Sequence, residues 1–547
     1  MMKKKVLVIG LDGATLDIIK PLADNGRLPN FSRLMREGSY GVLKSTIPPV
    51  TPCAWTSFAT GKDPSKHGLY DFTLYEGDPE KQTNVNRTFA KAKSLWRILT
   101  ENGKRSIVID VPFTYPPEEI NGCIIAREFS PSGKNCAYPR SLYGYLKKNG
   151  FIKKAPAELN EVHRHDNARN RVDRKVISKI EAKRISAEKI AKNFRELTEG
   201  VDRNIRLCRQ LMAEEEWDLF VAVFMSADHA GHSFWGDKGK VHKVYEKLDE
   251  AVGMLFRFAG PETLKLIISD HGFTSVPYAF NINEWLCSKG FLDKKIDIPY
   301  QDTRKRLRKV LKKIRDDAAE RRRGRKYKFK KFKFILNTDY SKSRAYLQSF
   351  TSYGVRINLK KRDDRGIVGA DEYRPMREYL IKELSRLNHP LTGKKLFEHV
   401  LKKEEVYAPG PFGTDPAPDI FLLTEGMETA LDGKFDRDAR VFKKTVKGYG
   451  FHHIDGILFV EGEDIKNGRI SNAGITDIAP TILHILGIPI PADMDGRVLK
   501  EIFSDSSEAR KKDVRHGAAA TARQRREIYP DSDDEDVRAK LAALGYL

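Results

Sequence analysis

Three aspartates, three histidines and one threonine occur in short segments that lie far apart along the chain. The segments are Leu11-Asp12-Gly13, Pro49-Val50-Thr51-Pro52, Asp228-x-x-x-His232, Asp270-His271-Gly272 and Gly450-Phe451-His452. Carboxylates and imidazoles bind divalent cations, and a hydroxyl beside such cations can act as a nucleophile. Together these residues predict an enzyme that uses two divalent cations and a threonine.

The elements that must position these residues are short apolar runs separated by helical patterns. Strands are predicted at 6–11, 106–110, 218–225, 264–269, 419–423 and 456–460, and helices at 27–37, 91–101, 476–486 and 533–544. Alternation of this kind predicts an α/β fold with a doubly wound, mostly parallel sheet between helices. Functional residues of such sheets gather at the carboxyl ends of the strands, where Asp12, Asp228 and Asp270 are expected.

Thr51 precedes Pro52 and a predicted helix that runs to Thr60. We expect Thr51 to be the N-cap residue and Pro52 the first helical residue. Two roles stay open for Thr51: it caps the helix only, or it is also a nucleophile at a helix N-terminus that attracts phosphate. Thr56 and Ser57 are weaker candidates, because they fall inside the helix.

The histidines divide into predicted ligands and neighbours. Asp228 and His232 are four residues apart, which suits one face of a helix and therefore one cation. His229 and His453 stand beside predicted ligands. We expect these two to lie around the site without binding a cation.

Composition indicates a globular chain of 547 residues with 40% apolar residues. No run approaches the roughly 18–20 apolar residues that cross a bilayer, so no transmembrane segment is predicted. The five cysteines form no Cys-x-x-Cys pair. This favours a reducing, cytoplasmic location and argues against a disulfide framework.

The net charge of +23 is concentrated in one segment. Residues 304–333 hold 17 lysines and arginines against 3 acidic residues, a net charge of +14, with aromatic residues interleaved. Such a run is typical of a solvated helix or loop, and it could also bind an anionic partner, either nucleic acid or a membrane surface.

The predicted organisation is a catalytic core in three parts, 1–136, 216–290 and 341–503. A helical insertion at 137–215 and a basic insertion at 291–340 interrupt the core, and 504–547 form a polar C-terminal tail with a short helix. We expect both insertions to cover the edge of the sheet that carries the active site.

The motif set resembles the alkaline phosphatase superfamily, and within it the type I phosphodiesterase/nucleotide pyrophosphatase group. The matching motifs are Gly10-Leu11-Asp12-Gly13, Thr51-Pro52-x-x-Trp55-x-Ser57-x-x-Thr60-Gly61, His67-Gly68, Asp228-x-x-Gly231-His232, Ser269-Asp270-His271-Gly272 and Gly450-x-His452. The resemblance covers about 1–135, 215–290 and 340–503, and it implies an alkaline phosphatase-like α/β/α sandwich.

The resemblance also implies roles for the individual residues. One cation would be held by Asp228, His232 and His452, and the other by Asp12, Asp270, His271 and the Thr51 oxygen. Zinc fits these nitrogen and oxygen ligands, with manganese and iron as alternatives. Thr51 would form a covalent phospho-threonine that water then hydrolyses.

One position departs from the resemblance. Nucleotide-cleaving members carry Asn directly after a segment that reads His67-Gly68-Leu69-Tyr70-Asp71 here, and this chain has Phe72. Because that Asn donates to a phosphoryl oxygen, its loss puts a nucleotide substrate in doubt and requires another donor. Further along, Arg356, Asn358 and Arg362 are candidate substrate-binding residues, with a solvated strand edge as the alternative.

The function predicted from these observations is a two-metal hydrolase of phosphodiester or pyrophosphate bonds. A phosphomonoesterase or phosphoryl transferase with the same site is one alternative. A non-catalytic protein that binds nucleic acid or a membrane surface through 304–333 is the other.

Overall fold

The computed structural model describes most of the chain. The described residues are 4–75, 77–132, 134–152, 179–297, 335–408, 415–435, 438–446, 448–521, 526–544 and 546. Among them, no helix combines the length and the apolar character needed to span a membrane.

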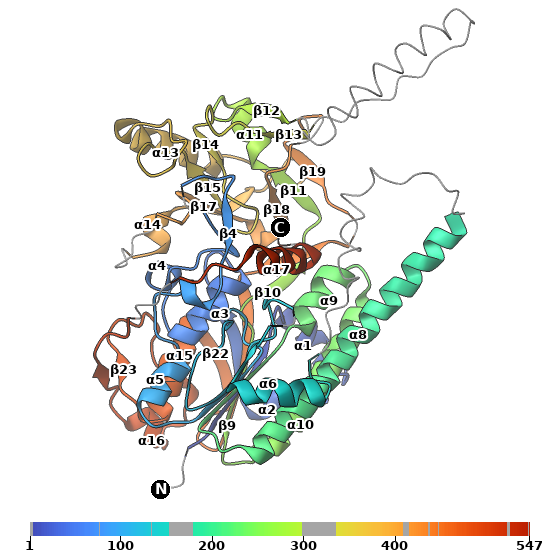
Figure 1. The fold of residues 1–547 in the computed structure, drawn as a ribbon, viewed down its shortest axis with the longest axis vertical. Helices are drawn as coiled ribbons and strands as arrows, with labels where there is room; N and C mark the ends of the chain where they lie inside the picture. Colours follow the sequence, from blue (N-terminus) through green and yellow to red (C-terminus); the bar gives the residue numbers. More distant parts are fainter. Residues whose placement is uncertain are drawn as a thin grey trace, which may run out of the picture.

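A nine-stranded, mostly parallel sheet forms the centre of the lower body in Figure 1. Its strands, in spatial order, are β22 (Gly468–Gly474), β2 (Ser39–Lys44), β21 (Asp455–Glu461), β9 (Leu264–Ile268), β1 (Val6–Leu11), β8 (Leu219–Phe224), β5 (Ser106–Ile109), β6 (Gly122–Ile125) and β7 (Ala137–Tyr138). From β9 to β6 every neighbouring pair is parallel. This confirms the predicted fold class.

Helices cover both faces of this sheet, as alternate residues of its strands require. Val6 and Val8 of β1 face a core formed with α3 (Thr51–Thr60), α5 (Leu95–Glu101) and α15 (Ile478–Ile485). Leu7 and Ile9 face a second core formed with α1 (Leu16–Asp24), α2 (Pro29–Glu37), α9 (Ser226–Phe234) and α10 (Lys238–Ala259). Both faces of β1 are therefore buried, which explains its uninterrupted apolar run.

Helix α8 (Lys179–Glu214) belongs to the second helical layer. Its residues Val201, Ile205, Cys208 and Leu211 are buried in the same core as α10. The described part of the predicted helical insertion thus packs on a face of the sheet. The expectation that it covers the active-site edge is wrong for this helix.

A second lobe lies above the central sheet (Figure 1). It contains the four-stranded antiparallel sheet β14 (Ala345–Leu347), β15 (Gly354–Ile357), β17 (Ile420–Thr424) and β16 (Phe397–Lys402), together with α11 (Ile282–Ser288) and α13 (Ala370–Ser385). The three-stranded sheet β18 (Thr429–Asp432), β11 (Tyr278–Asn281) and β19 (Phe442–Lys444) lies beside them. The predicted strand 419–423 is β17, so its expected place in the parallel sheet is wrong.

The basic segment 304–333 lies outside the described residues, and its predicted role stays a prediction. The flanking strands β12 (Lys294–Asp297) and β13 (Ile335–Thr338) pair with each other in antiparallel orientation.

The C-terminal tail ends in α17 (Asp531–Leu544), which begins two residues before the predicted helix. Figure 1 shows α17 between the central sheet and the second lobe. Val537 and Leu541 of this helix are buried in the first core. The tail is therefore a packed part of the fold rather than a polar appendage.

Candidate active site

Three neighbouring parallel strands bring three aspartates to one edge of the sheet. Asp12 follows β1, Asp270 follows β9, and Asp228 lies in the first turn of α9, just after β8. Gly13 has φ +69°, and its Cα lies against Asp228 so closely that a Cβ would be 3.0 Å from the Asp228 Cα. The glycine thus permits the tight turn that places Asp12 beside Asp228.

A fourth segment reaches the same edge from the opposite direction. The short strand β20 (Gly450–His453) pairs with β10 (Gly272–Ser275), and His452 is opposite Phe273. The next strand, β21, runs antiparallel to β9, so residues just before β21 lie at the carboxyl end of β9. This explains how His452 joins residues near Asp270 despite their separation in sequence.

The first ligand group is Asp228, His232 and His452. The Asp228 Oδ1 lies 3.2 Å from His232 Nε2 and 3.4 Å from His452 Nε2. The other ring nitrogen of His452, Nδ1, lies 3.0 Å from the carbonyl oxygen of Pro49. An N–H to a carbonyl leaves the opposite nitrogen as an acceptor, which is the arrangement of a metal-binding histidine.

The second group is Asp12, Asp270 and His271. His271 Nε2 lies 3.3 Å from Asp270 Oδ2 and 3.7 Å from Asp12 Oδ1, while its Nδ1 lies 3.0 Å from the Gly272 carbonyl oxygen. The indole N–H of Trp55 donates to Asp12 Oδ2 at 2.7 Å. This hydrogen bond gives the Trp55 of the sequence motif a physical role, since it orients the carboxylate.

The two groups adjoin each other. The rings of His271 and His452 stack with centroids 3.7 Å apart. The side chains of both groups are buried or nearly so. The structure thus places the six predicted Asp and His ligands in two neighbouring groups, with the same division as in the prediction, and the seventh predicted ligand, Thr51, lies outside these groups.

The electrostatics of the groups are unfavourable without a cation. Burial raises the pKa of Asp12 well above its ordinary value, and the charges of Asp270 and Asp228 raise it further. Burial and Asp228 likewise raise the pKa of Asp270. Burial and the neighbouring His452 lower the pKa of His271. Asp228 differs, because His232 and His452 outweigh its burial and hold its pKa well below the usual range.

Several buried polar atoms in these groups have no hydrogen-bond partner among the described residues. They are Asp12 Oδ1, Asp228 Oδ1, Asp270 Oδ2 and His271 Nε2. Leaving such atoms unpaired in the interior costs free energy, and their convergence in each group matches what a divalent cation requires. The residues present therefore fit a bound metal ion at each group.

Thr51 lies at the start of α3, on the same edge, and is fully buried. The N-cap is Val50, so Thr51 is the first helical residue and its predicted N-cap position is wrong by one residue. Val50 has no side-chain oxygen, and no side-chain cap closes the first turn of α3. The helix therefore keeps an N-terminus with the positive potential that favours a phosphoryl group.

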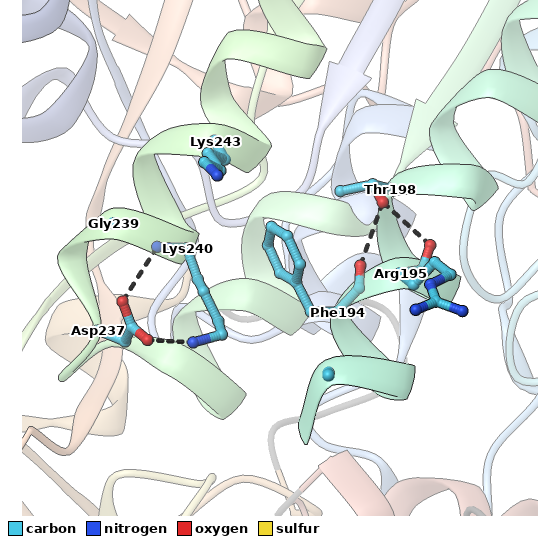
Figure 2. A pocket seen from close by; sticks show the side chains of 8 residues that line it. Phe194, Arg195, Thr198, Asp237, Gly239, Lys240 and Lys243 are labelled. Carbon is cyan, nitrogen blue, oxygen red and sulfur yellow. Dashed lines mark hydrogen bonds and ion pairs between the residues drawn. The ribbon is translucent and has the colours of Figure 1, made fainter. Parts of the chain in front are cut away.

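A cavity of about 1070 Å³ lies beside the two ligand groups. Aromatic residues that line it include Tyr75, Phe350, Tyr353, Tyr449, Phe451 and Tyr546, and its polar lining includes residues of the second lobe such as Gln348 and Lys443. A different hollow, of about 610 Å³, lies between α8 and the start of α10 (Figure 2). The polar contacts drawn there are internal to α8 and α10, whereas the larger cavity reaches the ligand groups through Tyr546 and Phe451, which contact Asp228 and His452.

Tyr546 is a site residue that sequence reasoning missed. Its phenolic O–H donates to Asp228 Oδ2 at 2.9 Å, and its ring stacks on Phe72 with centroids 4.3 Å apart. Burial raises the pKa of Tyr546 well above its ordinary value; Asp228 and Asp12 add to the rise and the Thr51 side chain opposes it. No periodicity or metal-ligand spacing surrounds this tyrosine, so the sequence carries no signal for it.

The candidate substrate-binding residues Arg356, Asn358 and Arg362 do not join this site. Arg356 binds Asp363 at 2.6 Å, and Arg362 binds Asp419 at 2.7 Å. The Asn358 amide donates to three backbone carbonyl groups, and none of these three residues lines the cavity. Apart from Asn358 Oδ1, which has no hydrogen-bond partner among the described residues, their polar groups are bonded inside the second lobe, and these contacts fit neither the substrate role nor a solvated strand edge.

The remaining motif histidines support the fold around the site. His67 lies 3.0 Å from the Ser57 hydroxyl and accepts from the Leu69 N–H at 3.2 Å. His453 accepts from the Asp455 N–H at 3.1 Å. His229 and His453 lie outside both ligand groups, and the expectation that they do not bind a cation stays a prediction.

Solved structures with the same fold are phosphoryl- and phosphonate-processing enzymes. Phosphonoacetate hydrolase from Sinorhizobium meliloti 1021 superposes with a TM-score of 0.52 at 14% identity, covering 89% of this chain and 95% of that chain. The structure of murine ectonucleotide pyrophosphatase/phosphodiesterase 5 is that of an inactive threonine-to-alanine variant in complex with AMP. It superposes with a TM-score of 0.50 at 12% identity, covering 92% of this chain and 100% of that chain. A mutant of the alkaline phosphatase PafA gives 0.50 at 15% identity, covering 92% and 100%. No curated protein sequence is significantly similar to this chain.

The fold is alkaline phosphatase-like, and one edge of its sheet carries two groups of candidate metal ligands. The family model for type I phosphodiesterase/nucleotide pyrophosphatase matches residues 6–427, so the chain belongs to that family and hydrolyses phosphoester bonds.

Proposed function

We propose that this protein hydrolyses phosphodiester or pyrophosphate bonds through a covalent phospho-threonine at Thr51, with a divalent cation at each ligand group. The observation that carries the proposal is the set of unpaired carboxylate and imidazole atoms that converge beside Thr51 and the N-terminus of α3.

Asp228, His232 and His452 would hold one cation, and Asp12, Asp270, His271 and the Thr51 oxygen would hold the other. We propose zinc at both groups, with manganese and iron as alternatives, because the donors are nitrogen and oxygen without thiolate. Bound cations would neutralise the phosphoryl oxygens and favour the deprotonated threonine.

The chain's own residues define the steps. The Thr51 oxygen attacks phosphorus, the bond from phosphorus to the leaving oxygen breaks, and a threonine–phosphorus ester forms. Water then attacks phosphorus, the threonine–phosphorus ester breaks, and the threonine oxygen is regenerated by protonation. The N-terminus of α3 stabilises the negative charge of the phosphoryl group in both steps.

The cavity favours a diester or pyrophosphate over a monoester. A volume of about 1070 Å³ beside the ligand groups accommodates a second substituent on phosphorus, and a phosphomonoester does not need that space. A phosphomonoesterase or phosphoryl transferase with the same residues is the alternative.

Thr51→Ala tests this function. We expect turnover of bis-p-nitrophenyl phosphate to fall more than about a thousandfold, with metal content unchanged, because the nucleophile is lost and six ligands remain. Thr56→Ala is the matched control, since Thr56 lies in the same helix and outside the ligand groups. Acid-quenched wild-type enzyme should carry a p-nitrophenyl phosphoryl group on the peptide that contains Thr51, because the second aryl substituent stays on phosphorus.

Substantial turnover by the Thr51→Ala enzyme would show that water attacks directly. A faster reaction with p-nitrophenyl phosphate than with the diester would favour the monoesterase.

We also propose a cytoplasmic location, which the five free cysteines support. Recovery of the protein in a membrane or exported fraction would contradict it.

A further inference from the structure

The tail that leads to Tyr546 is fixed to the protein along its length. The Glu527 N–H donates to the Thr88 hydroxyl at 2.9 Å, and the Asn86 amide donates to the Glu527 carbonyl at 2.8 Å. Further along, the Asn84 amide donates to the Asp534 carboxylate at 2.7 Å. These contacts connect the tail to the loops beside the active site and define the path of α17.

The end of α17 directs Tyr546 inward. The Tyr546 N–H donates to the Leu541 carbonyl at 2.9 Å, which turns the chain back after the helix. The Tyr546 side chain is 1% exposed and stacks on Phe72, while the His232 ring meets it edge-on at 5.1 Å. Tight packing on both sides gives the ring one orientation.

That orientation aims the only polar atom of the ring at the ligand groups. The phenolic oxygen is 2.9 Å from Asp228 Oδ2 and 3.4 Å from His452 Nε2. Tyr546 also lines the cavity of about 1070 Å³. The phenol therefore lies at the boundary between the cavity and the ligand groups, where a phosphoryl group must sit to be within reach of Thr51.

Phe72 is the residue that holds the Tyr546 ring in this position. It is fully packed in the core, and its ring is the surface on which Tyr546 stacks. Phe72 has no hydrogen-bond donor in its side chain, and the tyrosine it supports brings one. The pair together supplies an aromatic wall with a single O–H.

We propose that Tyr546 is a substrate-binding residue of this active site, whose phenolic O–H exchanges its hydrogen bond to Asp228 Oδ2 for one to a phosphoryl oxygen when substrate binds. The proposal rests on the proposed function, because it assigns the substrate's phosphoryl group to the space between Thr51 and the ligand groups. Phe72 is a positioning residue, since it acts by holding the Tyr546 ring.

The alternative for the same contacts is an autoinhibitory plug that must leave before substrate enters. The anchoring of the tail by Glu527 and Asp534, and the burial of Val537 and Leu541, favour a permanent wall. The two roles predict opposite effects of removing the tyrosine.

The experiment compares zinc-loaded wild type with Tyr546→Phe, with a chain truncated after Leu544, and with Tyr529→Phe. Tyr529 is the matched control: it is a buried tail tyrosine whose O–H donates to the Phe129 carbonyl, and it does not line the cavity. The measurements are kcat and KM for bis-p-nitrophenyl phosphate, the Kd of inorganic phosphate by calorimetry, metal content and Tm.

Tyr546→Phe should lower kcat/KM and weaken phosphate binding by about tenfold or more, because a hydrogen bond to a charged acceptor is lost. The variant should stay folded because the ring still stacks on Phe72, with Tm slightly lowered by loss of the hydrogen bond to Asp228 Oδ2 and metal content near that of wild type at saturating zinc. The truncated chain should lose at least as much activity, and Tyr529→Phe should stay within about twofold of wild type.

Faster turnover by the truncated chain, with Tyr546→Phe equal to wild type, would overturn the proposal in favour of a plug. Unchanged phosphate binding in Tyr546→Phe would also overturn it. If the wild type binds phosphate but cleaves neither bis-p-nitrophenyl phosphate nor p-nitrophenyl phosphate, the proposed function is wrong. The phosphate affinities of the variants then still decide the role of Tyr546. A zinc-loaded protein that binds no phosphate would contradict both the proposed function and the proposed role of Tyr546.

Discussion

The protein buries two clusters of charged side chains, and they are built in opposite ways. At the edge of the central sheet, Asp12, Asp228 and Asp270 converge with histidines and leave oxygen atoms unpaired. In the second lobe, Arg356, Arg362, Asp363 and Asp419 also lie buried, and each charge meets an opposite one.

The pairing in the second lobe is extensive. Asp419 contacts Arg362 at 2.7 Å and Lys403 at 3.4 Å, accepts from the Tyr373 hydroxyl at 2.7 Å, and accepts from the Ile357 N–H at 2.7 Å. Burial alone would raise the pKa of Asp419, but Arg362 and Lys403 hold it far below its usual range. Buried charge therefore indicates function only where its polar atoms lack partners; where they are paired, it indicates a structural role.

The variant Asp270→Asn should distinguish the roles of the two clusters most clearly. We expect a loss of at least about a hundredfold in turnover, together with a lower metal content, because a charged ligand is replaced by a neutral one. Enzyme assays and metal analysis of the same preparation measure both. Wild-type metal stoichiometry in this variant would remove Asp270 from the ligand set.

Asp419→Asn should lower stability and leave turnover and metal content unchanged, the opposite of Asp270→Asn. It leaves Arg362 and Lys403 buried beside a neutral side chain, so we expect unfolding free energy to fall by about 3–5 kcal/mol. The kcat of the folded enzyme and its metal content should match wild type. Denaturant unfolding with a parallel assay tests this, and a stable but inactive variant would place the second cluster in the catalytic machinery.

The pH dependence of the metal-free protein should also differ between the clusters. The raised pKa values of Asp12 and Asp270 make ionisation of the folded state unfavourable, so this cluster loses stability as pH rises through those values. The depressed pKa of Asp419 contributes stability above about pH 4 that is lost as pH falls.

In the presence of chelator at neutral pH, Asp270→Asn should therefore be about 1–3 kcal/mol more stable than wild type, and this gain should shrink in acid. The loss of unfolding free energy in Asp419→Asn should also become smaller in acid. Added zinc should reverse the order of wild type and Asp270→Asn, because cation binding stabilises only the complete site. Thermal unfolding from pH 4 to pH 8 checks these signs.

The smallest expected effect on chemistry is that of deleting 304–333, a basic segment outside both buried clusters. Turnover of the small diester should stay within about twofold of wild type. Retention on an immobilised polyanion should fall, and retention of the parent should decrease steeply with salt. Collapse of turnover in a folded deletion variant would show that the segment shapes the active site.

The sequence predicts the ligand groups well for a physical reason. Asp12, Asp228 and Asp270 follow buried parallel strands, and such strand ends meet at one edge whatever the intervening loops do. The roles of Arg356 and Arg362 could not be predicted, since a motif shows which charges are present and does not show which of them are paired. The parallel-sheet assignment of 419–423 fails for a similar reason, because a short apolar run carries no information about its partner strand.

Tyr546 is a site residue that could not be predicted from the sequence. It reaches the site because α17 packs on the first core and the Tyr546 N–H bonds back to the Leu541 carbonyl after the helix ends. Neither event leaves a periodic trace in the sequence. The resemblance to the family likewise points to a missing donor after Asp71 and does not say where a substitute lies.

The antiparallel strand β21 joins β9 to β2 and, through β2, to the outermost strand β22. Until residues 455–461 pair with β9 and β2, the backbone of β9 is an open edge, and the two outer strands have no attachment to the rest of the sheet. A folding intermediate that lacks this strand exposes a template for intermolecular pairing and lacks His452 at the first ligand group. Pairing of β21 therefore covers the open edge of β9 and also brings His452 to the first ligand group.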